Sequence, residues 1–155
     1  MKKLILSMFA AVALAVSAAA PVMAAEDNYF PGDDPIDVVF LGGSITEGTS
    51  GSFGTDFPSG AGYATYVDSY LKETYGDTRV KYHNSGIGGT GSAFGFNRMY
   101  DECMKYNPDL VFVEFAVNDY WSGASTRKNM ESIVRNLQTL KNPPYIVFLY
   151  TGQYN

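Results

Sequence analysis

Three strongly apolar runs, separated by segments with helical periodicity, constrain the fold of this chain more than any other feature. The runs span Ile36–Leu41, Leu110–Phe115 and Tyr145–Tyr150, are rich in Val, Ile and Phe, and show little alternation with polar residues. Strands buried on both faces have this pattern, whereas strands with one wet face alternate. A weaker candidate strand spans Arg79–His83. The pattern predicts a parallel sheet covered by helices.

Apolar side chains also recur three or four residues apart between the runs, as in amphipathic helices. Ser125 is a suitable N-cap for the helix predicted before Pro143. Right-handed crossovers between the strands would give a doubly wound α/β/α sandwich with a flavodoxin-like parallel sheet. Because a further helix should cover the last strand, we interpret the chain as the front part of a longer domain. Three helices are predicted, each before a helix-ending residue: Ala64, Val67 and Leu71 before Gly76; Met99 and Cys103 before Pro108; Met130, Ile133, Val134, Leu137 and Leu140 before Pro143.

The N-terminus has the three parts of a secretory signal peptide. Lys2 and Lys3 precede an apolar run over 4–20, and small side chains follow up to Ala24. The alternative is a membrane anchor, for which the apolar run is slightly short. We predict a protein secreted by a bacterium, organised as a signal peptide over 1–24, a linker over 25–35 and a single domain over 36–155.

Composition excludes several classes of function. The chain has 11 Lys and Arg against 16 Asp and Glu, a net charge of −5, whereas a nucleic-acid binder would be basic. The single cysteine, Cys103, cannot form an internal disulfide. No metal-ligand spacing is present. We predict no cofactor, no nucleic-acid partner and no membrane association after signal cleavage.

Ligands of such a sheet bind where the strands end, so the loops there are the candidates for chemistry. After the first run, Gly42-Gly43-Ser44 can form a tight turn that exposes the Ser44 hydroxyl; alternatively Ser44 only caps a helix. The glycine-rich loop over 84–92 can bring backbone N–H groups close to an anion. After the third strand, Asn118 can donate an amide N–H, or can simply belong to a turn.

The glycine-rich loop also supports a different hypothesis. It contains the spacing G-x-G-x-x-G from Gly86 to Gly91, and Glu114 at the end of the next strand could bind a ribose. The chain could therefore be a dinucleotide-binding enzyme, although this turn is the second in the fold and not the first.

A serine, a glycine N–H and an asparagine amide at one sheet edge would form a site for acyl transfer. The three blocks resemble those of the SGNH or GDSL hydrolases, a family of esterases and acylhydrolases, over Ile36–Tyr150. The matching residues are Gly42-Gly43-Ser44, Gly89 and Ala116-Val117-Asn118-Asp119. The resemblance implies that Ser44 is the nucleophile and that Ser44 N–H, Gly89 N–H and the Asn118 side chain form the oxyanion hole.

The chain departs from the family pattern at three places. Gly43 stands where the family has Asp, and Ala116 where it has Gly. The block D-x-x-H, which supplies the acid and the histidine base, is absent, and the resemblance implies that it follows Asn155. The only histidine is His83, with Val80 three residues before it, and we predict a structural role for it because a catalytic base must be oriented by a third group.

The combined prediction is a secreted serine esterase that forms an acyl-Ser44 intermediate. Its substrate would be a small-molecule or polysaccharide ester, and deacetylation of polysaccharides is favoured over lipid hydrolysis. Without a base, the 155-residue chain alone would be nearly inactive. One alternative is a non-catalytic module that binds carbohydrate or ester in a degenerate site; the other is the dinucleotide enzyme.

Overall fold

The computed structural model describes residues 29–48, 62–119 and 123–151. The predicted signal peptide and residues 25–28 of the predicted linker lie outside the described residues. The chain divides into two compact units, 1–32 and 33–155, and every helix and strand described below belongs to the second.

Four strands form one parallel sheet, in the order β2-β1-β3-β4. β1 and β3 are the inner strands, and almost all of their residues are buried because neighbours cover both edges and both faces. All residues of the edge strand β4 are only half-buried. The predicted flavodoxin-like sheet is confirmed, with strands β1 (Ile36–Gly42), β2 (Val80–Gly86), β3 (Leu110–Glu114) and β4 (Tyr145–Phe148).

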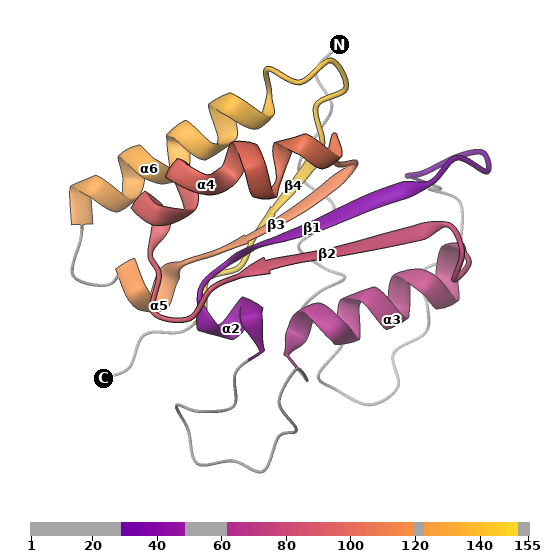
Figure 1. Cartoon of the computed structure of the whole chain (residues 1–155), viewed down its shortest axis with the longest axis horizontal. Coiled ribbons are helices and arrows are strands. Elements are labelled where there is room, and N and C mark those ends of the chain that lie inside the picture. The colour runs from indigo at the N-terminus through magenta and orange to yellow at the C-terminus, as the bar shows by residue number, and fades with distance from the viewer. Residues whose placement is uncertain (1–28, 49–61, 120–122, 152–155) are drawn as a thin grey trace. The chain divides into compact units, whose positions relative to one another are not determined.

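Three long helices connect the strands and lie on both faces of the sheet (Figure 1). One face carries α3 (Tyr63–Tyr75), which ends at Gly76 with a positive φ of 104°. The other face carries α4 (Ser92–Glu102) and α6 (Gly123–Leu137). The three-layer α/β/α architecture is therefore confirmed. Among the described residues α6 is the longest helix, with 15 residues, and none has the length and hydropathy of a membrane span.

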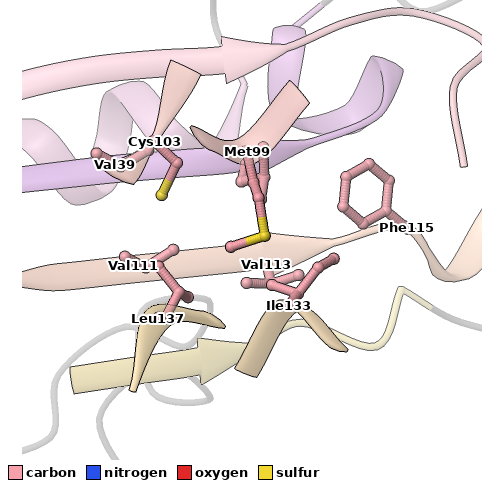
Figure 2. Close-up of a cluster of buried hydrophobic side chains, with 9 residues drawn as sticks. Val39, Met99, Cys103, Val111, Val113, Phe115, Ile133 and Leu137 are labelled. Atoms are coloured by element: carbon pink, nitrogen blue, oxygen red, sulfur yellow. The ribbon is translucent and has the colours of Figure 1, made fainter. Parts of the chain in front are cut away.

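Successive residues of the inner strands point to opposite faces of the sheet and fill two cores. On the α3 face, the Phe40 ring stacks on Phe112 at 4.8 Å between centroids and meets Tyr63 edge-on at 5.9 Å. On the α4 and α6 face, strand and helix residues form the cluster drawn in Figure 2: Val39, Leu41, Val111, Val113, Phe115, Met99, Cys103, Ile133 and Leu137.

Some local predictions differ from the structure. α6 begins at Gly123, so Ser125 lies inside its first turn and is not the N-cap. β2 extends to Gly86, which places His83 in the middle of a strand and not at its end beside the glycine-rich loop. Short helices that apolar periodicity cannot reveal occupy three connections: α2 (Ser44–Glu47), η2 (Met104–Tyr106) and α5 (Ala116–Asp119).

Candidate active site

The three predicted loops meet at the carboxyl edge of the sheet. β2 and β3 lie on opposite sides of β1, so the chain leaves β1 toward one side and leaves β3 toward the other. This divergence is the topological switch point, where open parallel sheets form a ligand crevice. The short helices α2 and α5, which follow β1 and β3, lie at this edge (Figure 1).

The first block forms a tight turn from strand to helix. Gly43 is the N-cap of α2 without a side-chain hydrogen bond, and its carbonyl accepts the Glu47 N–H at 2.9 Å. Ser44 is the first helical residue and is half-buried, so it does not occupy the N-cap position. A Cβ on Gly43 would lie 2.7 Å from Asn118 Nδ2. A side chain at position 43 would therefore require the Asn118 amide to move.

The second block turns outward at Gly89, which has a φ of +72° and is exposed. Glycine adopts this left-handed conformation without the strain that a Cβ introduces. No hydrogen bond from the Gly89 N–H is formed within the part of the chain that the structure describes. At the neighbouring Gly88, a Cβ would lie 3.9 Å from the Ser44 Cβ. The second block is therefore beside the serine.

The third block is held against the second by two side chains. The Asn118 Nδ2 donates to the Thr90 carbonyl at 2.9 Å. The buried Asp119 accepts the Ser92 N–H at 2.9 Å on Oδ1, and so caps α4, whose N-cap residue Gly91 has no side chain. These contacts fix the orientation of the Asn118 amide beside Gly43. Sequence reasoning found Asn118 but missed Thr90 and Asp119, since no spacing in the sequence indicates these partners.

Beneath the serine turn lies a buried acid. Glu114 is 2% exposed and accepts hydrogen bonds from Thr46 at 3.3 Å and from Thr151 at 2.9 Å. Burial raises the pKa of the Glu114 carboxyl. Its oxygens serve this internal network and do not reach solvent, so the geometry gives no support to Glu114 as the ribose-binding acid of a dinucleotide site.

His83 lies away from the serine. Its Nε2 is 2.7 Å from Asp37 Oδ1, and its ring stacks on Tyr106 with centroids 3.8 Å apart. Asp37 is five residues before Gly42 on β1, a separation of roughly 17 Å at the usual rise of a strand. Asp37 is thus a carboxylate that orients His83, which the sequence did not indicate, but His83 lies outside the hydrogen-bond reach of Ser44 that a general base needs. Its structural role stays a prediction.

A cleft of about 300 Å³ adjoins the third block. It lies where α5, the first half of α6 and the residues after β4 meet, and most of its surface is apolar. Its lining residues are Ala116, Asp119, Thr126, Arg127, Met130, Leu149 and Tyr150. Neither Ser44 nor Asn118 is among its lining residues.

The pattern of the GDSL-like Lipase/Acylhydrolase family matches residues 40–154. No curated protein sequence matches. The chain is similar to the crystal structure of a two-domain esterase active on acetylated mannans, with 35% identity and a TM-score of 0.65 over 74% of this chain and 29% of that one. The chain thus spans less than a third of that esterase.

Two further structures have the same fold. An acetyl xylan esterase is 27% identical, with a TM-score of 0.55 over 73% of this chain and 57% of that one. A lipase/acylhydrolase from Enterococcus faecalis is 21% identical, with a TM-score of 0.54 over 73% and 55% of the two chains, and shows the fold alone. The family match covers most of the chain and includes all three blocks of the crevice, and the chain therefore belongs to the GDSL-like lipase/acylhydrolase family.

Proposed function

We propose that the protein is a serine ester hydrolase with Ser44 as its nucleophile. The observation that carries this proposal is the convergence of Ser44, Gly88–Gly89 and Asn118 at the switch point of the sheet. A hydroxyl, exposed backbone N–H groups and an oriented amide are the groups that acyl transfer requires. The family to which the chain belongs performs this chemistry, which supports the assignment.

In the proposed reaction, Ser44 Oγ attacks the ester carbonyl carbon while a general base takes its proton. The oxyanion accepts hydrogen bonds from the Ser44 N–H, the Gly89 N–H and Asn118 Nδ2. An amide nitrogen has two N–H groups; one is donated to the Thr90 carbonyl, and the other is the proposed oxyanion donor. The tetrahedral intermediate expels the alcohol, which takes up the proton, and water then hydrolyses the acyl-serine.

The general base is proposed to come from a D-x-x-H block of the full-length protein, since the one histidine of this sequence is held by Asp37. The proposed organisation also keeps the signal peptide over 1–24, the linker over 25–35, the enzyme domain from residue 36 and export from the cell. The proposed substrates are acetyl esters of polysaccharides. The support for this class is the similarity to an esterase active on acetylated mannans and to an acetyl xylan esterase.

The test is release of acetate from acetylated mannan and acetylated xylan by the full-length protein, beside p-nitrophenyl butyrate as a simple ester. Ser44→Ala should lower the turnover of every ester by about 10⁶-fold, the usual loss for a serine nucleophile. Ser125→Ala, an exposed serine on α6, is the matched control and should keep full activity. Full activity of Ser44→Ala would refute the nucleophile.

A second candidate is a binding module with a degenerate site, favoured by one observation: the remote position of His83. The two candidates differ in their reaction with a fluorophosphonate, which labels an activated serine. Binding of acetylated mannan by the full-length protein, without labelling of Ser44 and without acetate release, would favour the binding module.

A further inference from the structure

The peptide group between Gly42 and Gly43, just before the serine turn, is hydrogen-bonded through both its N–H and its carbonyl. Its N–H, that of Gly43, donates to the Glu114 carbonyl at 3.1 Å. Its carbonyl, that of Gly42, accepts two hydrogen bonds at 3.0 Å, from the Ile87 N–H and from Arg98 Nη2. The turn that presents the serine is thus fixed by β3, by the glycine-rich loop and by one charged side chain.

That side chain is placed at some cost to stability. Arg98 is 7% exposed, forms an ion pair with Glu102 one helical turn later, and lies over the Phe94 ring at 5.6 Å. Its Nε is buried and, within the described residues, has no hydrogen-bond partner. A buried donor without a partner is unfavourable, so stabilising α4 does not by itself account for this arrangement.

A second arginine shows that an ion pair within a helix does not require burial of the arginine. Arg135 on α6 forms an ion pair with Glu131 at the same spacing of four residues, at 2.6 Å. Its side chain is 74% exposed, so the pair forms without burial of the cation. The two pairs differ because the Arg98 guanidinium also donates a hydrogen bond to the Gly42 carbonyl.

We propose that Arg98 is a positioning residue for Ser44, a role that rests on the proposed function of Ser44 as nucleophile. Its guanidinium fixes the Gly42 carbonyl through a charge-assisted hydrogen bond, which is stronger than a neutral one. Since the same carbonyl also accepts the Ile87 N–H, Arg98 sets the serine turn and the glycine-rich loop relative to each other. Both proposed backbone donors of the oxyanion hole, Ser44 N–H and Gly89 N–H, depend on that alignment.

The test compares four variants of the full-length protein: Arg98→Ala, Arg98→Lys, Glu102→Gln and the matched control Arg135→Ala. Arg98→Ala should lower kcat by roughly tenfold or more, the effect of losing a hydrogen bond from a charged donor, with KM changed by less than about twofold. Arg98→Lys, which retains a cationic donor, should recover part of kcat. Glu102→Gln and Arg135→Ala should keep kcat within about twofold, because neither removes the donor to Gly42.

Hydrogen exchange of single amides tests the contact without any enzymatic activity. In Arg98→Ala the Gly43 and Ile87 amides should exchange roughly tenfold faster, while the amides of Val111 and Phe112 in β3 keep their rates. Equal acceleration of all these amides, or unchanged kcat in Arg98→Ala, would overturn the positioning role. If Ser44→Ala kept full activity, the nucleophile assignment would fail, whereas faster exchange at Gly43 and Ile87 would still report the contact. Should Arg98→Ala not fold, Arg98→Lys is decisive: a wild-type kcat together with unchanged exchange rates of the Gly43 and Ile87 amides would refute the proposal.

Discussion

The two halves of the sheet each hold part of what a serine hydrolase needs. At the carboxyl edge, Ser44 and Asn118 meet at the switch point. In the other half, His83 and Asp37 form a hydrogen-bonded pair between β2 and β1. In the register of the sheet His83 pairs with Val39, whereas Gly42 pairs with Gly86, three residues farther along both strands. Residue types of a catalytic triad are therefore present in one chain, yet the register of two strands keeps them apart.

The largest effect is expected from removing the proposed oxyanion donor at the carboxyl edge, Asn118. Asn118→Ala should lower kcat by roughly 10²–10³, the usual loss for one such donor, because the developing negative charge loses an oriented N–H. The measurement is steady-state ester cleavage by the full-length protein, with Asn97→Ala, an exposed asparagine on α4, as the control. An Asn118→Ala protein with wild-type kcat would show that the carboxyl edge does not form the predicted oxyanion hole.

The second experiment probes the other half of the sheet. His83→Ala removes a hydrogen bond to a carboxylate and a stacked ring, so the free energy of unfolding should fall by about 1–2 kcal/mol while ester cleavage is retained. Urea denaturation measures the first quantity, and Lys81→Ala on the same strand is the exposed control. Loss of ester cleavage in a folded His83→Ala protein would identify His83 as the base and would show that both halves of the sheet take part in the reaction.

The smallest expected effect concerns the buried acid beneath the serine turn. Because burial raises the folded-state pKa of Glu114 above its ordinary value of 4.5, the native state holds the proton more tightly than the unfolded chain. This contribution to stability is fully present below pH 4.5 and is lost as the pH rises through the raised pKa.

Glu114→Gln stays neutral, so its free energy of unfolding should rise relative to that of the wild type as the pH increases above 4.5. The exposed Glu73→Gln is the control for this comparison. Parallel pH profiles for wild type and Glu114→Gln would mean that burial does not raise the pKa of Glu114.

Local sequence patterns were sufficient for the elements but not for their connections. The apolar run at Ile36–Leu41 predicted β1 to within one residue, since an inner strand must be apolar on both faces. β2 was predicted too short because its second half, Asn84-Ser85-Gly86, is polar and lies at an edge of the sheet. Ser125 was a wrong N-cap because α6 extends back to Gly123, which the apolar spacing does not reveal.

The sequence by itself determined the order of strands and helices, the three blocks at the strand ends and the predicted roles of Ser44, Gly89 and Asn118. The order and the blocks depend on periodicity, glycine content and residue type, all of which are local along the chain, whereas the predicted roles of the three residues come from the resemblance to the family. Only the tertiary structure decided which groups touch: Thr90 on Asn118, Asp119 on the first turn of α4, and Arg98 on the Gly42 carbonyl. Such contacts join residues 27 to 56 positions apart, and they exist because parallel strands bring their carboxyl ends to one edge, where most buried polar atoms find a partner.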